Sequence, residues 1–305
     1  MKPEYLRYEE IDKLRWDECI ANATNGLIYA QSFYLDAFSP QWAGLVLNDY
    51  EAVMPLTWKK KYRIGYLYQP AFTQQGGIFS KNPLHEETLK SFSDGVLENF
   101  RFGEFALNAD RFHDILSEHI SPLNNYLIDL GKDYGSLGKQ YLPGFSKSLR
   151  RIKKFNLKYA SSSDFNAAVD LYQNLYSKRL PHMKDDVFLS FKKVCEKLSL
   201  TGQVIIRQAF AENGQLVALV LLLNDGKRLY NLVSCITKDG KTLEANYFLY
   251  DRLIEEFAGS GLILDLEGSD QAGVAKFYEK MGGVNQPYGF VRYNFLPPLI
   301  KLLKK

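Results

Sequence analysis

The sequence has few cysteines and histidines, which makes a disulfide framework or a metal centre improbable as its means of stabilisation. Its three cysteines, Cys19, Cys195 and Cys235, are far apart and odd in number, and no C-x-x-C pair occurs. The four histidines have no spacing typical of metal ligands. We therefore expect no disulfide framework, no zinc site and no other metal.

Long apolar runs and a large net charge are also absent. The longest apolar run, Leu216 to Leu223, has the length of a strand, not of a membrane span. The N-terminus lacks the apolar stretch of a signal peptide. With 38 basic and 35 acidic residues, the net charge of +3 is too small to identify a nucleic-acid-binding protein. We expect a cytoplasmic, reduced protein.

Enough apolar material is present for two hydrophobic cores. The chain has 305 residues, 46% of them apolar and 14% aromatic. Residues 204–236 contain three β-type runs separated by Asn213-Gly214 and Asp225-Gly226, dipeptides that favour tight hairpins, so a three-stranded meander is predicted. Apolar periodicity predicts further elements around the meander, namely helices at 164–180, 186–199, 243–258 and 273–283 and a buried strand at 262–267.

The first half repeats this order of elements. Its predicted helices are 9–22, 31–38 and 86–100, and its predicted strands are 42–48, 51–58, 62–69, 103–108 and 125–130. Gly, Ser and Pro concentrate at 131–149, which predicts a boundary there. The fold class is therefore α/β (α+β). We predict two domains, 1–145 and 146–305, each with a mixed, mainly antiparallel sheet flanked by helices.

Three stretches carry a resemblance to a known family. They lie at 125–158, with the basic run SKSLRRIKK, at 264–270, LDLEGSD, and at 273–283, GVAKFYEKMGG. With the element order, they resemble the GNAT acyltransferase fold and, more closely, the Fem (FemABX-like) family. Fem proteins carry two tandem GNAT-like domains and add amino acids from aminoacyl-tRNA to the peptidoglycan precursor lipid II. The resemblance implies two GNAT-like domains and acyl or aminoacyl transfer to an amine.

The region that binds acetyl-CoA in GNAT proteins has an unusual sequence here. In place of the R/Q-x-x-G-x-G/A turn, residues 238–246 read KDGKTLEAN. If Lys241 takes the R/Q place, Glu244 and Asn246 occupy the glycine places. A carboxylate repels a diphosphate, and side chains block close backbone approach. We expect no tightly bound cofactor, and the donor is aminoacyl-tRNA or an acyl-CoA held elsewhere.

Two carboxylates interrupt the predicted strand at 262–267. Period-two alternation would put Asp265 and Glu267 on the same face, about 7 Å apart, near the end where open sheets bind ligands. They can position or deprotonate an amine, with Glu267 preferred as the base. The alternative is a structural role, in which both anchor Ser269 and the helix that follows.

Tyr278 matches a position at which many GNAT enzymes keep a tyrosine that acts as an acid. The residue lies four positions before Gly282 in the run YEKMG. A phenol there can protonate the leaving group. The alternative is a partly buried aromatic side chain on the inner face of its helix.

A basic run without any acid lies between residues 146 and 158. At helical spacing one face carries Lys147, Arg150, Arg151 and Lys154. This face suits phosphates, whether of tRNA, of a pyrophosphoryl lipid or of CoA. A solvated charged surface is the alternative.

Two further segments suggest contacts with ligands. The Gly-rich segment 68–77 follows a predicted strand, and it either lines a pocket or is an ordinary connector. The C-terminal FLPPLIKLLKK, residues 295–305, mixes apolar residues with lysines and can touch an anionic membrane surface or dock onto the protein. Such contact would bring the protein to the inner surface of the membrane.

Together these features predict acyl or aminoacyl transfer by direct attack on an amine. In this interpretation Glu267 and Asp265 handle the amine, Tyr278 donates a proton, and the basic face binds phosphate. The acceptor would be a lipid-linked or small-molecule amine, with cell-wall precursor modification as the context that the Fem resemblance implies. Two alternatives stay open, namely a GNAT-type N-acetyltransferase that uses acyl-CoA and a non-catalytic binding protein on the duplicated fold.

Overall fold

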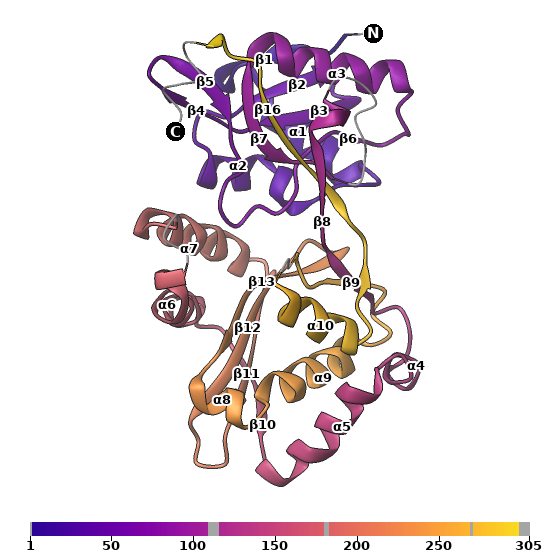
Figure 1. The fold of residues 1–305 in the computed structure, drawn as a ribbon, viewed down its shortest axis with the longest axis vertical. Coiled ribbons are helices and arrows are strands. Elements are labelled where there is room, and N and C mark those ends of the chain that lie inside the picture. The colour runs from indigo at the N-terminus through magenta and orange to yellow at the C-terminus, as the bar shows by residue number, and fades with distance from the viewer. Residues whose placement is uncertain (1, 109–115, 180–182, 269–270, 299–305) are drawn as a thin grey trace. The chain divides into compact units, whose positions relative to one another are not determined.

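The computed structural model describes residues 2–108, 116–179, 183–268 and 271–298 of the chain. Contacts divide the chain into two compact units, which Figure 1 shows as ribbons. Unit 1 comprises Met1–Leu123 and Pro287–Lys305, and unit 2 comprises Asn124–Gln286. Among the described residues, no helix combines the length and the apolar character that crossing a membrane requires.

Unit 1 contains two sheets and three α-helices. The four-stranded antiparallel sheet has the order β1 (Glu4–Leu6), β2 (Ala43–Leu47), β3 (Ala52–Leu56) and β6 (Phe79–Ser80). The five-stranded mixed sheet has the order β4 (Trp58–Lys61), β5 (Ile64–Leu67), β7 (Phe102–Ala106), β16 (Tyr288–Asn294) and β8 (Ile120–Leu123). The helices are α1 (Lys13–Asn22), α2 (Ser32–Phe38) and α3 (Glu86–Asn99), with 3₁₀ turns at Tyr8–Glu10, Ile28–Ala30 and Ser117–His119.

Unit 2 is built on one seven-stranded mixed sheet. Its order is β10 (Lys158–Ser162), β11 (Val204–Phe210), β12 (Leu216–Asn224), β13 (Arg228–Ile236), β14 (Ile263–Asp265), β9 (Tyr126–Asp129) and β15 (Val284–Asn285). The helices are α4 (Tyr134–Gly138), α5 (Pro143–Ile152), α6 (Phe165–Tyr176), α7 (Asp185–Ser199), α8 (Lys238–Thr242), α9 (Ala245–Phe257) and α10 (Ala272–Lys280), with 3₁₀ turns at Lys153–Phe155 and Ser177–Arg179.

Helices cover both faces of the central strands in unit 2. In Figure 1, α6 and α7 lie on one side of β11–β13, and α9 and α10 lie on the other. β12 is accordingly buried along almost its whole length, because side chains on both of its faces meet helices. The core between the sheet and α9 includes Phe145 of α5 and Leu249 and Leu253 of α9.

Each unit is completed by a strand that comes from a distant part of the chain. In unit 1, β16 near the C-terminus lies between β7 and β8. In unit 2, β9 precedes all the other strands of its sheet in sequence and lies between β14 and β15. The chain therefore divides differently from the predicted 1–145 and 146–305, and the predicted boundary falls inside α5.

The predicted fold class is confirmed, since the structure is a mixed α/β protein with three sheets. The meander is present as β11–β13, and both of its turns have a glycine at positive φ, 83° at Gly214 and 88° at Gly226. α6 begins where predicted, because the side chain of Asp164 accepts a hydrogen bond from the Ala167 N–H. The predicted boundary segment 131–149 instead forms α4 and most of α5, which begin after Asp133 and at Pro143.

Candidate functional site

In unit 2, strand β13 is bonded to β14 over only part of the length of β13. They pair in parallel over Arg228–Tyr230 and Ile263–Asp265, whereas β13 continues to Ile236. Beyond Tyr230, β13 has its regular partner only on the β12 side. There the register skips Leu232, since Leu221 pairs with Val233 and Leu222 pairs with Asn231. In a bulge of this kind the extra residue, Leu232, is left out of the regular pairing, and the ladder is locally disrupted.

A short chain of hydrogen bonds joins β13 to α9 at this bulge. Asn231 Nδ2 donates to Tyr250 Oη at 2.7 Å, and Tyr250 Oη lies 3.1 Å from Ser234 Oγ, to which it donates. Burial raises the pKa of Tyr250 to about 12. The phenol therefore stays protonated at neutral pH and keeps the direction of the chain fixed.

Tyr278 of α10 lies in the core near this chain. Its side chain is 8% exposed, and its ring lies 5.8 Å from that of Tyr126 between centroids. Burial raises the pKa of Tyr278 well above its ordinary value, and the nearby Tyr250 and the carboxylate of Glu267 raise it further. The residue is therefore a protonated phenol at neutral pH, and the charge of Glu267 is close enough to influence it.

Asp265 is a fully buried carboxylate with several partners. Arg228 Nη1 donates to its Oδ2 at 2.7 Å, the Glu267 N–H donates to its Oδ1 at 3.1 Å, and the Asn125 side chain also contacts it. Burial raises the pKa of Asp265, against the opposing effect of the Arg228 guanidinium. Because its oxygens are engaged, Asp265 holds the turn that carries Glu267.

Glu267 does not lie on the strand with Asp265. The prediction of one strand over 262–267 with both carboxylates on the same face is wrong, because β14 ends at Asp265 and Glu267 has a φ of 63°. A left-handed backbone breaks the period-two alternation. Non-glycine residues rarely adopt this conformation, and those that do are concentrated at functional sites. The half-buried Glu267 side chain is thus presented by a turn.

The predicted phosphate-binding residues lie on the exposed side of α5 and the turn after it. Lys147, Arg150, Arg151 and Lys154 are all exposed. The opposite face of α5 buries Phe145, Ser148 and Ile152. Basic side chains near the last turn also interact favourably with the negative end of the helix dipole.

One of these cations is bound to the start of α9. Arg151 Nε donates to Glu244 Oε2 at 2.7 Å, and its Nη2 bonds the other carboxylate oxygen. Glu244 precedes α9 with a φ of 52°, the conformation that a glycine adopts without cost. The side chain of Asn246 follows in the first turn of α9. Both expected glycine places therefore carry side chains, and one of them is a carboxylate.

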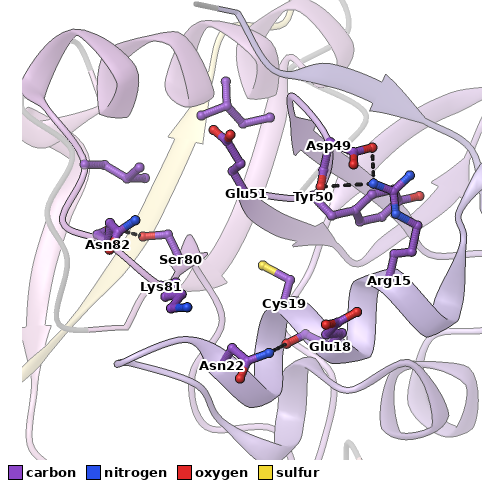
Figure 2. A pocket seen from close by; sticks show the side chains of 12 residues that line it. Arg15, Glu18, Cys19, Asn22, Asp49, Tyr50, Glu51, Ser80, Lys81 and Asn82 are labelled. Atoms are coloured by element: carbon purple, nitrogen blue, oxygen red, sulfur yellow. Dashed lines mark hydrogen bonds and ion pairs between the residues drawn. The ribbon is translucent and has the colours of Figure 1, made fainter.

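Unit 1 contains a separate open cavity of about 530 Å³. Figure 2 shows it between α1, which contributes Glu18 and Cys19, the turn after β2, which contributes Asp49 and Glu51, and the segment that begins at Ser80. Arg15 on its rim is paired with Asp49. None of the residues predicted for catalysis or phosphate binding lines this cavity.

The Gly-rich segment 68–77 also belongs to unit 1. Several of its residues line a cavity of about 20 Å³, which has room for roughly one water molecule. Gln69 braces the segment, because its Oε1 accepts from the Ala106 N–H at 2.7 Å. Among the described residues, no group of three or more His, Cys, Asp or Glu is placed to hold a metal ion.

The sequence-based search missed Asn231, Ser234 and Tyr250. A signal was available, because NLVSC places Asn231 and Ser234 among apolar residues of a strand, and buried polar side chains need partners. Tyr250 carried no such signal, since it is one of 20 tyrosines and lies on an apolar helix face.

No family model and no curated protein matches the chain. Solved structures do match it over almost the whole length. FemX is 11% identical with a TM-score of 0.67, covering 99% of this chain and 100% of that one. L-PGS from Bacillus licheniformis is 10% identical with a TM-score of 0.53, and the match covers 96% of this chain and 95% of that one. A tandem GNAT protein from the clavulanic acid biosynthesis pathway is 9% identical with a TM-score of 0.51, and the match covers 97% of this chain and 99% of that one. The chain has the tandem-GNAT fold.

Proposed function

We propose that this chain is an acyltransferase that moves an aminoacyl group from aminoacyl-tRNA to an amine. The Fem-like motifs and the likeness to FemX over 99% of the chain support acyl transfer. The observation that carries the choice of donor is the Arg151–Glu244 ion pair at the start of α9. The Glu244 carboxylate lies at the start of α9, where the diphosphate of acetyl-CoA would bind. The negative charges of the carboxylate and the diphosphate would repel each other.

The exposed cations of α5 are suited to a tRNA backbone. Lys147 and Arg150 project from α5, whose other face is buried, and Lys154 lies in the 3₁₀ turn that follows it. Phosphates spaced along a nucleic acid can pair with such a row, and each contact releases a counterion. Binding through these residues should therefore weaken as salt rises.

The acyl-transfer centre would lie where β13 and β14 separate. The backbone N–H of Leu232, the residue that the bulge leaves out of the regular pairing, would bind the carbonyl oxygen of the donor ester as it gains charge. Glu267 would take the proton of the attacking amine, and Asp265 would hold the Glu267 turn. As the new C–N bond forms and the ester C–O bond breaks, Tyr278 would give its proton to the leaving ribose oxygen.

The acceptor in this proposal is a lipid-linked or small-molecule amine, as in modification of a cell-wall precursor. The C-terminal segment 295–305 would assist by touching an anionic membrane surface. Most of that segment, 299–305, lies outside the residues that the structure describes. The membrane contact therefore has its support in the sequence alone.

A thermal-shift comparison of the full chain with acetyl-CoA, with mixed aminoacyl-tRNAs and with buffer tests the donor. A ligand at about 100 times its dissociation constant stabilises a protein by roughly 2.7 kcal/mol. We expect aminoacyl-tRNA to raise the melting temperature and acetyl-CoA to leave it unchanged. The combined variant Lys147→Ala and Arg150→Ala should weaken the response to tRNA, whereas Lys192→Ala on α7 should not.

Two results would count against this function. Stabilisation by acetyl-CoA alone would favour a GNAT-type N-acetyltransferase, for which the likeness to the tandem GNAT protein is the supporting observation. If neither donor binds, a non-catalytic binding protein on the duplicated fold is favoured. Transfer of a radiolabelled amino acid from tRNA to an added amine, lost in Glu267→Gln, would establish the reaction directly.

A further inference from the structure

Two asparagine side chains in unit 2 have buried oxygen atoms without a hydrogen-bond partner among the described residues. They are Asn231 Oδ1 on β13 and Asn246 Oδ1 on α9. Asn231 as a whole is only 5% exposed. Folded proteins satisfy nearly all of their buried polar atoms, because an unpaired acceptor costs stability. Each of these oxygens is therefore a candidate acceptor for a ligand.

Both asparagines are related to Tyr250, Asn231 by a hydrogen bond and Asn246 by its place on the same helix. Asn231 uses its amide nitrogen to donate to Tyr250 Oη, so its oxygen is directed away from that tyrosine. Asn246 precedes Tyr250 by four residues in α9 and therefore shares its helix face. Ser234, which Tyr250 contacts at 3.1 Å, adds a half-buried hydroxyl to the same group.

The position of Asn231 relates the group to the acyl donor. Asn231 directly precedes Leu232, the bulge residue whose backbone N–H would bind the carbonyl oxygen in the proposed centre. The α-carbon of an acyl group is bonded to the carbonyl carbon. A substituent on that α-carbon therefore lies within a few ångströms of the carbonyl oxygen, and hence beside Asn231.

We propose that Asn231 and Asn246 bind the α-amino group of the donor and make this centre selective for aminoacyl over simple acyl groups. This inference rests on the proposed aminoacyl transfer and deepens it by naming the residues that select the donor. An ammonium has three N–H donors and satisfies both oxygens. An acetyl or propionyl group has none and leaves both unpaired, which should cost roughly tenfold to a hundredfold in affinity.

Two stable analogues of a charged tRNA end test the selectivity. They are 3′-alanylamino-3′-deoxyadenosine and 3′-propionylamino-3′-deoxyadenosine, which differ only in the α-amino group. Their dissociation constants for the full chain are measured by calorimetry. We expect the alanyl compound to bind at least tenfold more tightly. Asn231→Leu and Asn246→Leu should each reduce that ratio toward one, whereas Asn166→Leu, the same change at an exposed position of α6, should preserve it.

Each result has a definite meaning. Equal affinity for the two analogues, or a ratio that survives both buried replacements, overturns the selectivity and leaves the transfer function standing. Failure of both analogues to bind overturns the aminoacyl-tRNA function, and the selectivity falls with it. A purely structural role for the asparagines would lower the melting temperature and weaken both analogues alike, so the ratio separates that role from recognition.

Discussion

The Arg228 guanidinium and the Asp265 carboxylate form a buried ion pair, with 2.7 Å between Nη1 and Oδ2. Arg228 belongs to β13 and Asp265 ends β14, so the pair spans the short stretch over which these strands are bonded. The side chain of Asp265 is 1% exposed and that of Arg228 is 20% exposed. Because Asp265 also accepts from the Glu267 N–H, the pair ties strand pairing to the turn that presents Glu267.

Asp265→Asn should therefore destabilise unit 2 strongly. Removing one partner of a buried pair leaves the other charge poorly compensated, at a cost of about 3 kcal/mol. Urea unfolding measures this change. The control is Asp170→Asn, which removes the exposed pair with Lys192 and should cost under about 1 kcal/mol. Equal losses in the two variants would show that Arg228 does not depend on Asp265.

The pH dependence of stability should reveal a second carboxylate, the half-buried Asp251 of α9. It accepts hydrogen bonds from Tyr134 at 2.8 Å and Tyr141 at 3.1 Å, yet burial raises its pKa above the ordinary value. The folded state then binds this proton more tightly than the unfolded state does. The contribution of Asp251 to the free energy of unfolding therefore falls as pH rises through its folded pKa.

Asp251→Asn removes this titration. The difference in unfolding free energy between the variant and the original protein should grow in favour of the variant as pH rises from below the ordinary carboxyl range through the raised pKa. Urea titrations at several pH values measure the difference. A difference that is flat with pH would mean that the two tyrosines offset burial completely.

Local patterns account for what could be predicted of this fold, and non-local pairing accounts for what could not. The meander and most helices are encoded within short windows, such as the Asp164 cap and the turn at Asn213-Gly214. The placement of β9 in the sheet of unit 2 and of β16 in unit 1 is not encoded locally, because each strand pairs with strands far away in sequence. The partner of Asp265 was hidden for the same reason, since Arg228 lies on another strand.

Freeing Arg151 should strengthen RNA binding. Glu244→Gln removes the carboxylate that holds Arg151 and leaves an amide of similar size. The freed guanidinium can take one more phosphate, so the slope of log affinity against log salt should steepen by roughly 0.7–0.9. Fluorescence polarisation with labelled tRNA at several salt concentrations measures the slope. The matched control is Glu255→Gln, which frees Arg252 on α9, and an equal change there would assign the effect to net charge alone.

Tyr278→Phe should reduce transfer without unfolding the protein. The replacement keeps the ring that lies against Tyr126 and removes only the hydroxyl group. That hydroxyl stays protonated because burial raises the pKa of Tyr278. Loss of a general acid typically slows a reaction by about 10²–10⁴-fold. We therefore expect kcat for aminoacyl transfer to fall by a factor in that range, while the melting temperature and the affinity for tRNA stay close to their original values.

The control is Tyr126→Phe, which removes a neighbouring hydroxyl that bonds Glu279 and should retain most of the activity. If both replacements slow transfer equally, the effect belongs to packing between the two rings and not to proton donation by Tyr278.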